Sequence, residues 1–214
     1  MTLTVIGFVL TAPSLVRSHD IISRGPLLTA EHQWQSMLPP DTHVLNDSVA
    51  IERFLDLLDG TPPEWPVLYG HGHHDSGLDD RLFALNRDRD AKREGKAALE
   101  WRVTFLWPGE LSDYDQESGG FRVAIGPNFT STRWGIVRFK PDDLPSLLAI
   151  ADPTVREEFR RTLEKGRCVE VKVAMTGTLL PHESVIYDFS HDDEGRGVIM
   201  PVVRIERVAF ILVR

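Results

Sequence analysis

The sequence predicts an α+β protein, mainly β, whose C-terminal part forms a five-stranded OB-like barrel with a helical insert between strands 3 and 4. Three observations support this fold class. Apolar and polar residues alternate in several short segments after residue 98, which is typical of strands. Helical patterns interrupt these segments after the third one, as in the OB-type order of elements. The apolar frame of the last segment slips by one residue at Arg207, which indicates the bulge or bend that closes a small barrel.

Five segments between residues 99 and 213 carry the strand pattern. The strongest begins at Leu99, where every second residue up to Trp107 is apolar. The predicted strands are 99–107, 121–125, 134–140, 169–175 and 198–212. A β-sandwich fragment or another small open barrel gives a similar order of segments, so both stay open as alternatives at this stage.

Two helices are predicted between the third and fourth strands. The first starts near Asp142 and runs to Ile150. The second begins at Asp152, whose carboxylate suits the N-cap position, and Pro153 occupies the first helical position. It runs to Lys165, and the glycine that follows is typical of a helix end.

Residues 1–97 are predicted to form an N-terminal α+β segment that ends in a His-rich connecting loop, and residues 98–214 form the barrel domain. A β-branched stretch at the start predicts a strand, and three helical patterns follow it. The best of them follows Asp47 or Ser48 as its cap and stops at Gly60. The predicted elements are a strand at 2–10 and helices at 29–37, 49–58 and 79–94.

Composition limits the classes of function. The chain of 214 residues has a net charge of −8, which disfavours a general binder of phosphate backbones. Its single cysteine, Cys168, excludes an intramolecular disulfide and is expected to be a small buried residue rather than a nucleophile. The N-terminus lacks the basic start of a signal peptide, and no apolar run approaches the ~18 residues of a membrane span. We therefore expect a soluble cytoplasmic protein.

The densest group of potential metal ligands is His71, His73, His74 and Asp75. Neutral imidazole and carboxylate groups are good ligands for zinc and similar ions, so a divalent metal is the one cofactor that the sequence suggests. The group lacks the helical spacing or the paired cysteines of a specific zinc motif. The alternative is a polar, glycine-flanked loop with weak metal affinity.

A second group of polar residues lies between the fourth and fifth predicted strands, at 190–197. It contains His191 and three consecutive acidic residues, and Asp188 precedes it. Such a loop helps to frame the ligand face of OB-type barrels. Its spacing differs from that of a calcium-binding loop, and a solvated hairpin connection is the simpler interpretation.

The middle strands carry a set of aromatic and basic side chains. Interleaved rings and cations on one barrel face bind single strands or sugars in OB-type domains. The residues predicted to bind a ligand are Arg102, Tyr114, Arg133, Trp134 and Arg138. The alternative is that Trp134 packs in the core and that the cations pair with the many carboxylates.

These patterns favour a non-enzymatic binding protein whose ligand is a partner protein or an oligomeric ligand. A metal-dependent hydrolase that uses the group at 71–75 is the first alternative, and a single-stranded nucleic-acid binder is the second. The hydrolase would gain support if the loops at 71–75 and 188–196 met in space, because together they contain histidines and several carboxylates.

Overall fold

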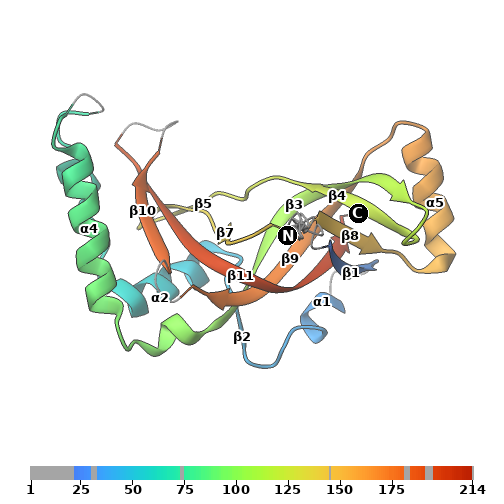
Figure 1. Ribbon diagram of the computed structural model, residues 1–214, viewed down its shortest axis with the longest axis horizontal. Coiled ribbons are helices and arrows are strands. Elements are labelled where there is room, and N and C mark those ends of the chain that lie inside the picture. The colour runs from blue at the N-terminus through green and yellow to red at the C-terminus, as the bar shows by residue number, and fades with distance from the viewer. Residues whose placement is uncertain are drawn as a thin grey trace, which may run out of the picture.

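The computed structural model of this protein is an elongated arrangement of strands with helices at both ends (Figure 1). It describes residues 22–29, 33–72, 75–144, 146–180, 184–190 and 195–213. The strand predicted at residues 2–10 lies outside these ranges, as do His73 and His74 of the predicted metal group. No helix among the described residues is long and apolar enough to cross a membrane.

Six strands pair in a closed circuit, which confirms a mainly β protein with a barrel. The order around the circuit is β1, β8, β4, β3, β9 and β11, and β11 returns to β1. The bounds are Ile22–Leu28 for β1, Arg102–Asp115 for β3, Gly120–Ile125 for β4, Ser146–Ile150 for β8, Val169–Leu179 for β9 and Gly197–Leu212 for β11. The predicted number of five strands is wrong, because β1 and β8 both belong to the barrel and neither was predicted.

Strand β1 escaped prediction because Gly25 and Pro26 resemble a turn. Both have a place in a strand here: β1 runs parallel to β8 and to β11 and seals the barrel between them. A Cβ atom at Gly25 would lie 2.3 Å from the carbonyl oxygen of Val208, so only glycine lets β1 approach β11 this closely.

Strand β8 replaces the predicted helix that ends at Ile150. A five-residue apolar run is compatible with either structure, and its burial decides the outcome. Leu147, Leu148 and Ala149 are all buried, because β8 lies inside the barrel wall between β1 and β4.

The third predicted strand, at residues 134–140, is not a barrel strand. It forms the short strands β6 (Gly135–Val137) and β7 (Lys140–Pro141), which both run parallel to the first half of β11. That half of β11 also pairs with β10 (Val185–Phe189), and β6 pairs with β5 (Thr130–Thr132). Strand β11 therefore belongs to the barrel at one end and to a smaller sheet at the other. The remaining strand, β2 (Thr42–Val44), is parallel to the start of β3.

The long predicted helices are confirmed. Asp47 caps the helix after it by accepting a hydrogen bond from the backbone N–H of Ala50, and Gly60 ends that helix with a positive φ. Asp152 caps the later helix in the same way, through the N–H of Thr154. The helices are α1 (Gln33–Ser36), α2 (Ser48–Asp59), α3 (Trp65–Tyr69), α4 (Leu78–Arg93), α5 (Pro153–Glu164) and the 3-10 helix η1 (Ala97–Glu100).

The predicted irregularity at Arg207 is confirmed as a break in pairing. The register between β9 and β11 shifts between Ile205 and Arg207, so one extra residue stands on β11. A bulge increases the local twist of a strand. It lies a few residues beyond Val203, where β11 pairs with both β7 and β9.

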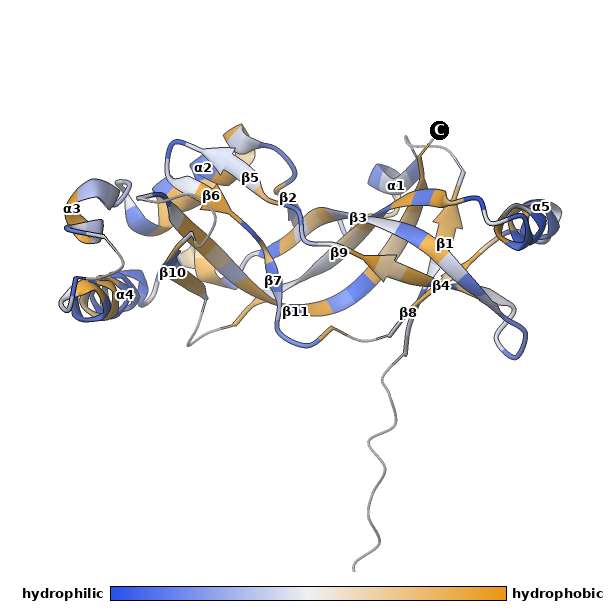
Figure 2. Cartoon of the chain, turned by 90° about the horizontal axis from the view of Figure 1, so that it is seen from above, coloured by the Kyte–Doolittle hydropathy of each residue, from blue (hydrophilic) through white to orange (hydrophobic). Residues whose placement is uncertain are grey.

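The N-terminal segment and the barrel share one apolar core. Helix α2 contributes four buried residues, and they belong to the same cluster as the barrel interior. Helix α4 packs on β10, while α5 covers the opposite end of the molecule, and both expose polar faces (Figure 2). The division between residues 97 and 98 stays a prediction. Two elements before it are tied to the part after it, because β1 pairs with β8 and β11 and α2 shares the apolar core of the barrel.

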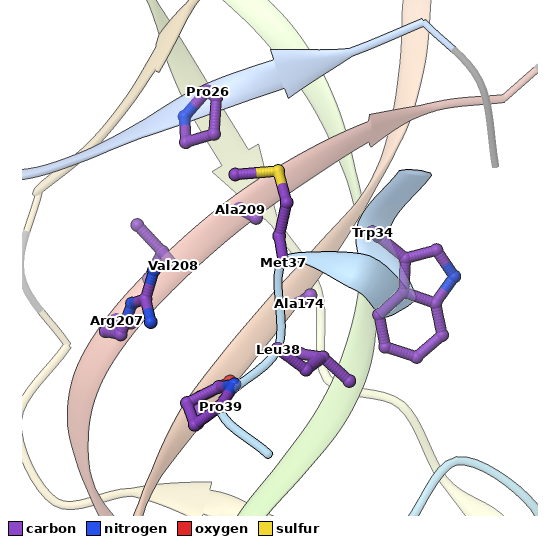
Figure 3. Close-up of a pocket in the computed structure, with 10 residues that line it drawn as sticks. Pro26, Trp34, Met37, Leu38, Pro39, Ala174, Arg207, Val208 and Ala209 are labelled. Carbon is purple, nitrogen blue, oxygen red and sulfur yellow. The ribbon is translucent and has the colours of Figure 1, made fainter. Parts of the chain in front are cut away.

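Helix α1 closes the outer face of the barrel over β9 and β11. Its Trp34 is buried and packs against Ala174 and Ile211. Leu38 and Met37 extend this cover toward Pro26, and a cavity of about 40 Å³ remains beneath them (Figure 3). A single water molecule occupies about 30 Å³ of liquid, so this cavity is too small for an organic ligand.

Candidate functional site

The described part of the predicted metal group is organised by one carboxylate. Asp75 accepts hydrogen bonds from the backbone N–H groups of His71 (3.2 Å) and Gly77 (2.9 Å) and forms an ion pair with Arg81 (2.9 Å). The hydrogen bond from Arg81 is the main reason why the pKa of Asp75 lies well below its usual range. Within the described residues there is no group of three or more His, Cys, Asp or Glu side chains that can hold a metal.

The bases of the two polar loops lie next to each other. Tyr69, at the end of α3, packs its ring 5.3 Å from that of Phe189, the last residue of β10. On the other side of the same loop, Gly195 has its Cβ position 3.8 Å from the ring of Tyr69. The backbone N–H of Ser190 donates to the carbonyl of Arg196, so these two residues extend the antiparallel β10–β11 pair up to the acidic loop. Residues 191–194 of that loop lie outside the described residues.

Arg102 and Tyr114 are at opposite ends of β3. They lie twelve residues apart, roughly 40 Å when measured along the strand. Arg102 forms ion pairs with Asp41 (2.6 Å) and Glu206 (3.1 Å). Tyr114 packs against Phe121, with a ring separation of 5.2 Å, at the α5 end of the barrel. The structure therefore does not bring these two residues into one surface.

Arg133 and Trp134 join the small sheet to α2. Arg133 forms ion pairs with Glu52 (3.4 Å) and Asp56. Trp134 is completely buried and donates its indole N–H to Asp56 (3.1 Å), while its own carbonyl accepts the indole N–H of Trp65 (2.6 Å). Both side chains therefore bind carboxylates of α2 and hold that helix against the small sheet.

Arg138 differs from the other predicted cations. It lies between β6 and β7, and its guanidinium carbon is 5.9 Å from the ring centroid of Trp107 and 5.6 Å from that of Phe129. Its Nε is buried and has no hydrogen-bond partner among the described residues, and the same holds for the indole nitrogen of Trp107. A buried donor without an acceptor costs roughly 1–3 kcal/mol, and more when it is charged.

The barrel wall opens between β4 and β8. Within the described residues, these strands pair at Phe121 with Ala149 and at Arg122 with Leu148 and nowhere else. Beyond Arg122, the described part of β4 continues to Ile125 with β3 as its one ladder neighbour. The start of β8 likewise pairs with β1 alone. The two strands thus diverge for the rest of their length.

Backbone groups of β4 face this opening. The N–H of Gly126 donates to the carbonyl of Pro108 on β3 (3.1 Å). Because backbone groups alternate sides along a strand, Ala124 also turns its N–H and C=O toward β3. Val123 and Ile125 then turn theirs toward the opening. A strand edge with exposed backbone groups is a template for another extended chain.

A pocket of about 330 Å³ occupies the opening. It combines apolar side chains with a few polar ones, and Asp115 and Arg122 are its charged members. The hydrogen bond from the Ser118 hydroxyl is the main reason why the pKa of Asp115 is lowered, and the charge of Arg122 contributes to the same effect. The lining residues are Ser112, Asp115, Arg122, Val123, Ala124, Ser146, Leu147 and Leu148.

A broader groove of about 880 Å³ adjoins the pocket, and Ala124 lines both. Its floor carries Glu110 and Glu170, which stand directly opposite each other on β3 and β9. The prediction that Cys168 is buried is wrong: its side chain is exposed here, because the residue precedes β9 instead of lying within it. A hydrogen bond to the Glu110 carboxylate raises the pKa of the Cys168 thiol, which disfavours a nucleophilic thiolate.

The sequence indicated part of this surface but not the opening itself. The strand predicted at residues 121–125 is β4, whereas β8 was expected to be helical. The signal that favours a strand is the length of its apolar run, since a helix needs about ten residues or more. That run contains five residues, from Leu147 to Ala151.

The chain was compared with family models, with curated proteins and with solved structures. None of the three comparisons found a match.

Proposed function

We propose that this chain is a non-enzymatic binding protein that takes an extended segment of a partner protein into the opening between β4 and β8. The observation that carries the proposal is the divergence of these strands after only two paired positions. Strand addition gains affinity from main-chain hydrogen bonds and specificity from pockets for alternate side chains. The opening supplies backbone groups at Val123 and a lining of mixed polarity for both purposes.

An OB-like relationship of the barrel is part of this proposal. It is supported by the position of α5 directly before β9 and by the bulge in β11. The sixth strand and the parallel pairs of β1 are departures from that pattern.

Closing the opening covalently is expected to abolish peptide binding. If the ladder continued beyond Arg122 and Leu148, Val123 would pair with Leu147 and Ala124 with Ser146. Ala124 and Ser146 are both exposed. In an Ala124→Cys/Ser146→Cys variant made with Cys168→Ser, a short thiol cross-linker would hold β4 against β8. Peptides selected from a displayed random library on the Cys168→Ser protein should then bind at least about tenfold more weakly, a loss of 1.4 kcal/mol. Isothermal titration before and after cross-linking measures this change.

The reduced double-cysteine protein and the single Ala124→Cys variant treated with the same reagent are the matched controls, and both should retain binding. Hydrogen exchange provides a second readout, because a bound peptide should slow exchange at Val123 and Leu147. Equal affinity in the cross-linked protein, or protection confined to the β10–β11 hairpin, would contradict the proposal.

The metal-dependent hydrolase stays as a second candidate because the bases of the 71–75 and acidic loops adjoin at Tyr69. It predicts one equivalent of zinc in protein purified without a histidine tag, and a lower melting temperature after chelation. Elemental analysis and thermal melts with and without EDTA check both points. A metal content near zero together with an unchanged melt would end this candidate.

A single-stranded nucleic-acid binder receives less support. Arg102 and Arg133 are engaged by carboxylates, and the net charge is −8. Such a function requires affinity that falls steeply with salt concentration.

A further inference from the structure

Arg138 is held at the surface end of a ring cluster. Its backbone N–H donates to the carbonyl of Ile199 on β11 (3.0 Å), which fixes the segment between β6 and β7. From there its guanidinium lies over Trp107, a residue of the barrel interior that is 5% exposed. The second ring, Phe129, is 54% exposed, so one side of the cluster faces solvent.

The arginines that support the fold have acceptors. Arg93 and Arg102 each bind two carboxylates, and Arg89 donates to two backbone carbonyls. The side chain of Arg138 makes no hydrogen bond or ion pair with any described residue, although its Nε is shielded from water. The cost of this arrangement falls on the Nε, because a buried donor that is left without an acceptor destabilises the fold.

The buried indole nitrogen of Trp107 is a second, independent donor without an acceptor in the described part of the chain. The guanidinium carbon beside the first donor lies 5.9 Å from the centroid of the ring that carries the second. A ligand that serves both must present at least two acceptor atoms and must compensate a positive charge. A carboxylate meets both requirements, since its two oxygens match the planar donors of a guanidinium.

We propose that Arg138 and Trp107 form a binding site for a carboxylate group, with Phe129 as its outer wall. This site lies near the opening between β4 and β8, because Phe129 follows Ile125 by four residues, at most ~14 Å of chain. The assignment of this carboxylate to an acidic residue or the C-terminus of the partner segment rests on the proposed function. The site itself does not.

Titration with sodium acetate at constant ionic strength tests the site without a peptide. In ¹⁵N-labelled protein, Trp107→Phe identifies the indole resonance of Trp107. We expect a saturable shift of that resonance with acetate and none with chloride. In Arg138→Met, which keeps the packing of the stem but removes the charge, the acetate affinity should fall at least about tenfold.

Arg160→Met is the matched control, because Arg160 also lies over a ring, that of Tyr114, but is paired with Glu157 and Glu164. It should leave the acetate titration unchanged. Arg138→Met should also melt no lower than the parent protein, as expected for an unpaired charge. An unmoved Trp107 resonance, an equal shift in Arg138→Met, or a response to phosphate but not to acetate would overturn the assignment.

The cross-linked double-cysteine protein separates this inference from the proposed function. If it loses peptide binding but keeps the acetate response, both stand. If it keeps peptide binding and the acetate response, the site stands and the opening is not the peptide site. If Arg138→Met leaves the affinity for selected acidic peptides unchanged, the carboxylate does not come from the partner segment.

Discussion

Replacing Arg93 by methionine is expected to lower the free energy of unfolding by about 3–5 kcal/mol. Arg93 and Asp59 are buried almost completely and form a bidentate pair with two N–O distances of 2.7 Å. Arg93 also donates to the carbonyl of Val185 on β10 (2.9 Å), and the Tyr187 hydroxyl donates to Asp59. Methionine would leave the Asp59 carboxylate buried without its cation, in the contact that joins α2 and α4 to the small sheet.

The pKa of Arg93 indicates which effect dominates. Burial by itself lowers it, but the hydrogen bonds and charge of Asp59 outweigh burial, so the pKa lies above its ordinary value. Urea unfolding measures the loss of stability. Arg87→Met is the control, since Arg87 is exposed and pairs with its exposed neighbour Asp88, and its effect should stay within about 0.5 kcal/mol. A loss below about 1 kcal/mol in Arg93→Met would show that the pair does not hold this contact together.

Replacing Gly25 by alanine is expected to destabilise the protein by about 2–3 kcal/mol. The added Cβ would lie 2.3 Å from the carbonyl oxygen of Val208, a backbone atom of β11 that cannot move without disturbing the barrel. Thermal and urea unfolding measure the loss. Hydrogen exchange at Phe210 and Ile211, where β1 pairs with β11, should rise with it.

Gly126→Ala is the same chemical change at a position where the added Cβ meets no atom of the described residues within 4 Å. It should leave stability unchanged to within about 0.5 kcal/mol. Equal stability of the two alanine variants would show that β1 does not depend on its close approach to β11.

Local patterns predicted the helices because their signals are local. Asp47, Gly60 and Asp152 act on backbone groups a few residues away, so their roles can be recognised without knowledge of the rest of the chain. The same holds for the alternating strands β3 and β9 and for the bulge at Arg207. In each case the deciding contact lies within one element or one ladder.

The ligand residues were predicted less well for a physical reason. Sequence identifies Arg102, Arg133 and Arg138 equally as cations beside aromatic residues, but it does not show which carboxylates lie across the fold from them. Asp41, Glu52 and Asp56 come from the N-terminal segment and engage two of the three. Arg138 alone of these lacks a carboxylate within the described residues.

The sequence by itself determined a mainly β protein with capped helices, a barrel in its C-terminal part and a bend in its last strand. Only the tertiary structure decided that β1 completes a six-stranded circuit and that β4 and β8 part to leave an opening. The first outcome depends on contacts between residues more than a hundred positions apart, such as Gly25 with Val208, and the second on pairing between separate strands, such as Phe121 with Ala149. The steric space and pairing partners that such contacts create are not encoded in any local pattern.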